Sequence, residues 1–296
     1  ATAFDAERAF RMAVLAEERV AVLRGSLGVA HAQAARVESL WAEGLALQSD
    51  RQWLTAHMRE MEAMVAGAGA DSAEARSVLG LVMGAEGPVG DSLAKPSDPD
   101  PSSAPALSES VDAASQRGDV EAARAQWRAA DAMRGVARAE LLPAMEVMAS
   151  TEHNSQDFFG EGGNQWMVGL GARWRLDAGA PGRARSASAR AQAARQAYEM
   201  TSRNAVHEAR VAYDRLLAAE RQVAALDAAV AAAEESFRLV EARHRESLVT
   251  TLELTQSQDA LTRTRLGAAA AHQDRALALA ALQLAAGMSA SAEESR

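Results

Sequence analysis

Apolar residues recur every three or four positions over most of the chain, and this spacing predicts long helices. The predicted helices cover residues 1–43, 50–84, about 119–142, about 181–246 and about 250–286. Pro143 stops the third helix and Pro181 suits the first turn of the fourth, because proline has no backbone N–H to donate. At ~1.5 Å per residue the fourth helix would be about 100 Å long, which exceeds the needs of a globular core.

The helix predicted over 181–246 carries an apolar stripe with steps of four and three residues, as coiled coils do. The stripe consists of Ala205, Ala209, Ala212, Leu216, Ala219, Val223, Leu226, Val230, Ala233, Phe237 and Val240. The helix predicted over 1–43 has a stripe of the same kind, from Ala6 to Val37. Further alanines around the long helix permit a second seam, and helices with two seams can close into a ring.

The period changes to strict alternation between residues 166 and 176, which predicts a strand with two unlike faces. One face holds Trp166, Val168, Leu170, Ala172, Trp174 and Leu176, and the other holds Met167, Gly169, Gly171, Arg173 and Arg175. A weaker alternation at 145–150 and a glycine-containing stretch at 154–164 complete a β-hairpin, which we place at 144–179.

The chain also repeats itself, because residues 6–84 align without a gap on residues 209–287 at an offset of 203. Identical pairs include Val20 with Val223, Glu43 with Glu246, and Gly84 with Gly287. The predicted organisation is a first repeat at 1–84, a linker at 85–118, a second repeat at 119–287 and a C-terminal tail at 288–296. The linker holds five of the seven prolines, so we expect little regular structure there.

Composition narrows the function. The formal net charge of −9 argues against a nucleic-acid partner, which would need a basic patch. The chain has no cysteine, which removes thiol catalysis and cysteine-based metal sites. The six histidines form no ligand pair, and no catalytic constellation or phosphate-binding glycine loop is present, so we expect no enzyme activity, cofactor or metal. The longest uncharged apolar run, 276–287, is too short to span a bilayer as a helix.

Four stretches in this order resemble the TolC-like outer-membrane factors, also called outer membrane efflux proteins. They are residues 138–143 leading into a strand, the Trp166–Trp174 strand, the tip Glu43-Gly44-Leu45 with Asp50, and the return helix ending at Gly287. The resemblance implies a mainly α fold, in which long coiled-coil helices form an α-barrel and β-hairpins contribute to a transmembrane β-barrel, with an internal two-fold repeat. It further implies a homotrimer that extends from the outer membrane into the periplasm.

In function, the resemblance implies a passive export duct of a tripartite efflux or type I secretion system. Its partners would be a periplasmic adaptor protein, an inner-membrane pump and outer-membrane lipid. Trp166, Val168, Leu170 and Trp174 would face lipid, while Arg173 and Arg175 would face the lumen. The two helical tips would contact the adaptor. Their residues are Glu43, Gly44, Leu45, Asp50, Glu246, Ser247, Leu248 and Glu253.

The sequence leaves alternatives open. The alternating strand could lie over a soluble core, and the tips could be plain helical-hairpin loops. Asp50 and Glu253 could belong to an acidic ring that controls cation entry, but spacing does not aim them inward. The rival function is a soluble periplasmic coiled-coil adaptor or scaffold. In the second repeat, a helix and a hairpin precede the long helix. At the offset of 203 residues, the equivalent segments of the first repeat would come before Ala1, so we expect an ascending helix and a second hairpin there.

Overall fold

The computed structural model describes residues 3–90, 93–94, 104–154, 163–175, 177–246 and 248–288. Its elements are α1 (Ala3–Ala42), α2 (Gln48–Met83), α3 (Leu107–Ala114), α4 (Gly118–Ala139), β1 (Ala144–Asn154), β2 (Gly163–Arg173), α5 (Ala180–Arg245) and α6 (Thr251–Ala286). The chain divides into two compact units. One comprises Ala1–Ala114 with His207–Arg296, and the other comprises Ser115–Val206.

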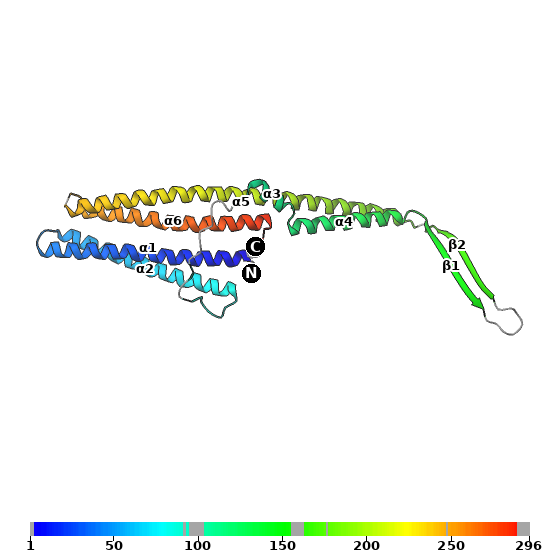
Figure 1. Cartoon of the computed structure of the whole chain (residues 1–296), viewed down its shortest axis with the longest axis horizontal. Coiled ribbons are helices and arrows are strands. Elements are labelled where there is room, and N and C mark those ends of the chain that lie inside the picture. The colour runs from blue at the N-terminus through cyan, green and yellow to red at the C-terminus, as the bar shows by residue number, and fades with distance from the viewer. Residues whose placement is uncertain are drawn as a thin grey trace. The chain divides into compact units, whose positions relative to one another are not determined.

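In the first unit, α1 packs against both α2 and α6, and α3 packs on α6 (Figure 1). An ion pair between Arg265 and Glu234 at 2.7 Å and a hydrogen bond between His272 and Asp227 at 3.0 Å join α6 to α5. The apolar stripes predicted on α1 and α5 lie at buried or half-buried positions of these helices. Small side chains along the stripes let the backbones approach closely, which suits helices packed side by side.

The helix ends repeat at the offset of 203 residues. The return helices α2 and α6 both contain 36 residues, and their bounds differ by this offset at both ends. Both end at a glycine with positive φ, 74° at Gly84 and 72° at Gly287. Only glycine adopts this left-handed conformation without steric cost, and there it closes the last helical turn. The superposition of the two repeats in space stays a prediction.

Two hydrophobic clusters lie at equivalent positions of the repeats. The first is built on Ala9, Ala13 and Leu79, and the second contains Ala212, Leu216 and Leu282. Their half-buried neighbours also correspond in sequence: Phe10 with Tyr213, Ala75 with Ala278, and Val82 with Ala285. The linker contributes to both clusters, through Val89 and Leu93 to the first and through Ala104 to the second.

The expectation of little regular structure in the linker is wrong for α3. This helix begins two residues after Pro105, and Ser110 and Ala114 on it are fully buried. Proline and serine dominate the linker only up to this point, whereas residues 107–114 have apolar side chains at positions 107, 111 and 114. A helix of two turns is marginal alone, so packing against α6 supplies its stability.

In the second unit, α4 lies along the first part of α5. The rings of Trp127 on α4 and Tyr198 on α5 stack with centroids 5.7 Å apart, and the Arg195 guanidinium lies 6.0 Å from the Trp127 ring. The strands β1 and β2 pair antiparallel from Ala144↔Arg173 to Asn154↔Gly163. The hairpin thus connects the two helices of this unit. β1 begins shortly after α4 ends, and β2 ends shortly before α5 begins.

The prediction that Trp174 and Arg175 continue the strand is wrong, since β2 ends at Arg173. In the observed register the partner of Trp174 would be Pro143, which has no N–H to donate to a ladder. The strand instead extends at its other end, to Gly163. The alternation of β2 therefore fixes the faces of Trp166 and Arg173 but not those of Trp174 and Arg175.

Candidate functional site

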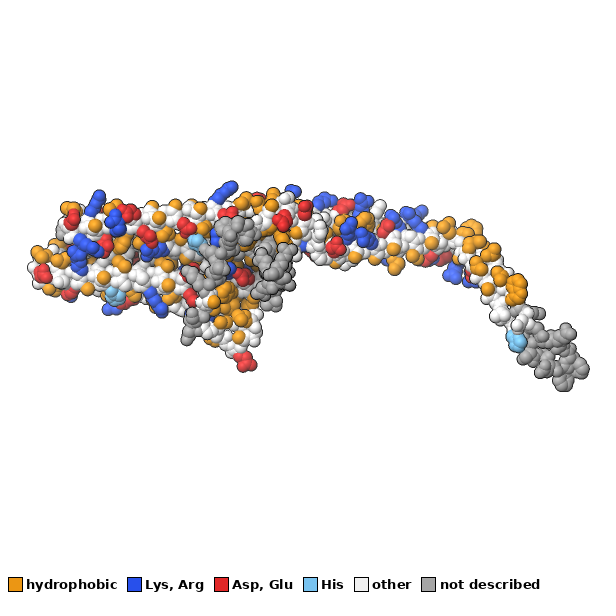
Figure 2. Space-filling model, viewed as in Figure 1, with side chains coloured by type: hydrophobic (Ala, Val, Ile, Leu, Met, Phe, Trp, Pro, Cys, Tyr) orange, Lys and Arg blue, Asp and Glu red, His pale blue; other side chains and the backbone are white. Residues whose placement is uncertain are grey.

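The hairpin has one apolar face that no part of its own unit covers. Cross-strand pairs Val147↔Leu170, Ala149↔Val168 and Thr151↔Trp166 lie on this face. Trp166 and Leu170 each have 79% of their surface exposed. In the space-filling view, apolar side chains gather on the part of the hairpin that adjoins the helices (Figure 2). Such a continuous apolar face in water would be costly, so it marks a surface meant for contact with something apolar.

The opposite face of the hairpin is mixed, because it carries the exposed Met148 and Met167 together with an ion pair. Arg173 donates to Glu146 with Nη2 and Oε1 3.2 Å apart, and Gly169 and Gly171 lie on the same face between Met167 and Arg173. A Cβ added at Gly171 would come within 3.1 Å of the Glu146 side chain, so this glycine leaves room for the ion pair. The structure thus brings Arg173 together with a carboxylate, a partner that the sequence pattern did not indicate.

A three-membered ion cluster fixes the junction between helices and hairpin. Arg183 in the first turn of α5 donates to Glu140 after α4 at 3.1 Å and to Asp177 at 2.6 Å. The other carboxylate oxygen of Asp177 accepts the N–H of Gly179 at 2.7 Å, which shapes the turn into α5. One guanidinium therefore holds the chain entering the hairpin and the chain leaving it.

The α1–α2 tip is a tight turn with exposed leucines. Gly44 has a φ of 76°, and the N–H of Leu45 donates to the carbonyl of Leu40 at 2.7 Å. Leu45 and Leu47 are 71% and 68% exposed. Behind the turn, Arg51 donates to Glu38 at 2.6 Å, and its guanidinium lies 4.3 Å from the Trp41 ring centroid.

The α5–α6 tip repeats the turn at the equivalent residues. The N–H of Leu248 donates to the carbonyl of Arg243 at 2.9 Å, and Leu248 is 68% exposed. Thr250 caps α6 by accepting the N–H of Glu253 at 3.2 Å. Glu43, Glu246 and Glu253 are exposed and Asp50 is half-buried, while Ser247 lies outside the described residues.

The two tips interact through charge. Burial lowers the pKa of His244 at the end of α5. The positive charge of Arg36 on α1 lowers this pKa further, and the negative charge of Asp50 on α2 opposes both effects. These groups come from three helices, so the turns of both repeats lie within electrostatic reach of one another. The predicted tip residues thus gather at one end of the first unit.

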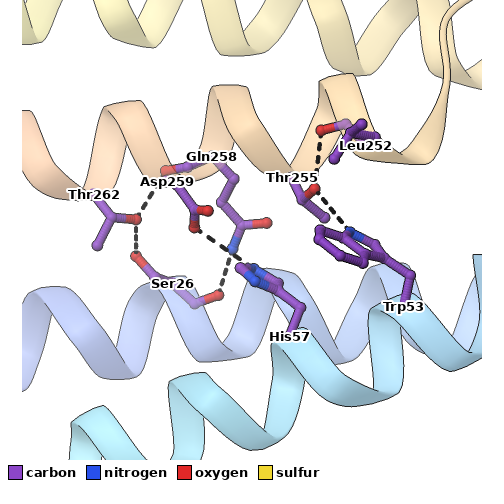
Figure 3. A network of polar contacts seen from close by, with 8 residues as sticks. All are labelled: Ser26, Trp53, His57, Leu252, Thr255, Gln258, Asp259 and Thr262. Atoms are coloured by element: carbon purple, nitrogen blue, oxygen red, sulfur yellow. Dashed lines mark hydrogen bonds and ion pairs between the residues drawn. The ribbon is translucent and has the colours of Figure 1, made fainter.

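A buried polar network joins the repeats behind the tips (Figure 3). The Ser26 and Thr262 hydroxyl oxygens are 2.7 Å apart, and Gln258 donates its side-chain amide to the Ser26 carbonyl at 2.7 Å. On the α2 side, Trp53 donates its indole N–H to Thr255 at 3.2 Å. Sequence reasoning missed this network. Its signal is the run of polar residues at 255, 258 and 262 where α6 should carry its apolar seam.

The described residues offer little for other chemistry. No group of three or more His, Asp or Glu in them could hold a metal ion. None of the helices that the structure describes combines the length and the apolarity required to cross a membrane. What the geometry supplies is contact surfaces: an apolar hairpin face and a pair of leucine-bearing tips.

The comparisons place this geometry among outer-membrane channels. Residues 110–288, more than half of the chain, match the outer membrane efflux protein family. A Pseudomonas aeruginosa membrane protein is similar in structure, with a TM-score of 0.72, 23% identity, and coverage of 96% of this chain and 67% of that chain. The Vibrio cholerae outer membrane protein VceC gives a TM-score of 0.68, 21% identity, and coverage of 96% and 69%.

The open Neisseria gonorrhoeae MtrE outer membrane channel gives a TM-score of 0.69, 22% identity, and coverage of 96% of this chain and 65% of that chain. The chain therefore spans about two thirds of the length of these structures. No curated protein matches the sequence. The chain belongs to the outer membrane efflux protein family.

Membership confirms the resemblance inferred from the sequence: the chain is TolC-like, and it is an efflux channel protein of the bacterial outer membrane that extends into the periplasm. The family is one of channels and not of enzymes.

Proposed function

We propose that the protein is one subunit of a passive trimeric export duct in a tripartite efflux or type I secretion system. The hairpin enters the outer membrane as part of a β-barrel, and the long helices line the periplasmic duct. An inner-membrane pump supplies the energy, because the chain offers no nucleotide-binding motif. The apolar face of the hairpin carries this proposal, since exposed valine, leucine and tryptophan side chains in alternation on a strand suit contact with lipid.

The geometry of the hairpin supports insertion. Each strand has 11 residues. A tilted strand of about 9–11 residues spans the apolar part of a bilayer. Val168, Leu170 and Trp166 would then face lipid, and Glu146 and Arg173 would face the lumen, where the ion pair stays hydrated. Trp174 and Arg175 follow the end of β2, so the strand does not fix their faces. We propose that Trp174 lies at the membrane interface and Arg175 on the aqueous side.

The tips would dock on a periplasmic adaptor protein. Leu45 and Leu248 present apolar side chains at equivalent positions, and Glu43 and Glu246 place a carboxylate two residues before each. Gly44 forms the turn of the first tip, and Ser247 is the residue at the equivalent sequence position of the second repeat. Threefold repetition would set six such motifs around the duct. Asp50 and Glu253, also equivalent in the repeats, would add carboxylates that concentrate negative charge near its entrance.

Site-directed labelling tests the orientation of the hairpin. Single cysteines at Val168, Leu170, Gly171 and Arg173 are introduced into the protein in outer-membrane vesicles. A lipid-confined maleimide should label positions 168 and 170, and a membrane-impermeant maleimide admitted to the lumen should label 171 and 173. The reversed pattern would overturn the orientation. Labelling of all four by the aqueous probe in a soluble fraction would instead indicate the rival periplasmic scaffold.

Crosslinking tests the tips. A photoreactive amino acid at Leu45 or Leu248 should crosslink to a helical-hairpin adaptor in intact cells. Leu81 is the matched control, because it is also an exposed leucine, at 78%, but lies at the opposite end of α2. Equal adaptor crosslinking from position 81, or none from 45 and 248, would contradict docking at the tips.

A further inference from the structure

The polar network above the tips contains a titratable pair that the efflux function does not explain. His57 on α2 is 6% exposed, and its Nε2 lies 3.7 Å from Oδ1 of Asp259 on α6 (Figure 3). That distance is too long for a hydrogen bond, and Nε2 is buried without a hydrogen-bond partner. A buried polar atom without a partner is costly, so this arrangement needs a physical reason.

Three further ionisable groups lie around Asp259, the carboxylate that faces His57. Two carboxylates face the site, Asp259 on α6 and Glu60 one turn further along α2, against the single positive charge of Arg263. With a neutral imidazole this group has an excess of one negative charge, and protonation of His57 cancels it. From α1, the Ser26 hydroxyl and carbonyl reach the network and are uncharged, while Arg24 and His31 are exposed.

Asp259 is suited to such a partner. Burial raises the pKa of its carboxyl, and Glu60 acts in the same direction, whereas His57 and Arg263 lower it. The carboxylate therefore gains from a nearby cation more than an exposed aspartate would. Burying a charged imidazolium costs free energy, and this cost opposes the attraction between the two groups. The cost is limited because the Asp259 side chain is 41% exposed, so water reaches one end of the pair.

We propose that His57 and Asp259 form a proton-dependent latch that fastens α2 of the first repeat to α6 of the second when the surroundings become acidic. The proton adds to the ring of His57 and makes it an imidazolium, and the attraction to the Asp259 carboxylate, now 3.7 Å from Nε2, draws the two groups together until Nε2 donates to it. Without this proton the imidazole carries no charge, so it has no charge attraction to Asp259 and the contact is weak. Asp259 lies eight residues into α6, about 12 Å from its start, so the latch acts on the tip end of that helix.

The fixed part of the network determines where the latch closes. Gln258, beside Asp259, binds the Ser26 carbonyl, and Thr262 binds the Ser26 hydroxyl, whatever the pH. These bonds hold α6 on α1 and leave the α2 contact as the variable one. The inference does not depend on membrane insertion or on an adaptor, so it is tested on the chain itself.

Hydrogen exchange tests the latch. Backbone amide protection in residues 54–61 and 254–262 is measured at pH 7.5 and 5.5, after correction for the intrinsic dependence of exchange on pH. We expect protection to rise by about threefold or more at pH 5.5, the size of a partly exposed ion pair. His57→Gln and Asp259→Asn should each abolish the rise, and His31→Gln, at an exposed histidine of α1, should retain it.

Two results would overturn the proposal. One is a rise that survives Asp259→Asn, because the proton would then act elsewhere. The other is protection that stays constant or falls at pH 5.5 in the unsubstituted chain, because desolvation of the imidazolium would then exceed its attraction to Asp259. Asp259 is part-exposed, so the asparagine variant should fold, and circular dichroism at pH 7.5 verifies this independently of the latch.

Discussion

The two helical hairpins of the first unit, α1–α2 and α5–α6, agree in their buried positions and differ in their backbone details. Ala9, Ala13 and Leu79 in one correspond to Ala212, Leu216 and Leu282 in the other. Yet α2 starts after Leu47, which has no side-chain oxygen, whereas α6 starts after Thr250, which caps it. Apolar packing and terminal glycines therefore define the hairpin, and the remaining positions are free to diverge.

The two hairpins differ most clearly in the glycines inside their helices. Gly25 and Gly28 in α1 and Gly67 and Gly69 in α2 all face open space among the described residues. Their equivalents in the second hairpin are three alanines and a histidine, at positions 228, 231, 270 and 272. Because glycine costs a helix about 1 kcal/mol relative to alanine, the first hairpin should be the less stable of the two.

The equivalent leucines should give the largest effect. Leu79 is 2% exposed and Leu282 is 0% exposed, so replacing either with alanine should lower the free energy of unfolding by about 2–5 kcal/mol. Urea denaturation measures both. The comparison fails if one substitution is costly and the other is nearly neutral, since equivalent clusters should respond alike.

Gly80→Ala should have the next largest effect, because a Cβ there would lie 2.2 Å from the backbone carbonyl oxygen of Gly87. The loop after α2 would have to move, at a cost of about 1–3 kcal/mol. The equivalent residue in α6 is Gln283, where alanine should change stability by less than about 0.5 kcal/mol. A neutral Gly80→Ala would show that the loop does not rest on α2.

Thr250→Ala should destabilise α6 by about 1 kcal/mol through loss of its N-cap bond to Glu253. Leu47→Ser is the converse substitution, because it would give α2 the side-chain N-cap that it lacks and should stabilise it. Thermal denaturation should show a lower melting temperature for the first variant and a higher one for the second. If both lower it, capping does not distinguish the hairpins.

Gly67→Ala should have the smallest effect and the opposite sign, an increase of about 0.5–1 kcal/mol in the free energy of unfolding. The new methyl group would meet nothing within 4 Å among the described residues. Ala270→Gly at the equivalent position should destabilise by a similar amount. Loss of stability in Gly67→Ala would reveal a constraint on this glycine that the contacts do not explain.

The sequence predicted the helices well because their signals are local. The seam period, Pro143, Pro181 and the glycines after α2 and α6 placed the long helices within a few residues of their observed ends. It failed for α3, whose short apolar pattern is stabilised by α6, and for the end of β2, which depends on the partner Pro143. The His57–Asp259 pair could not be predicted, because 202 residues separate its members and only the fold brings them together.

The equal length of α2 and α6, 36 residues each, limits how such a protein can change in size. Adding one residue to either helix would turn everything beyond it by about 100° and carry Leu79 or Leu282 away from its cluster. Insertions should be tolerated only in sevens, since two turns of a coiled coil restore the seam. An engineer who wished to lengthen the duct would have to add the same heptads to all four descending and returning helices at once.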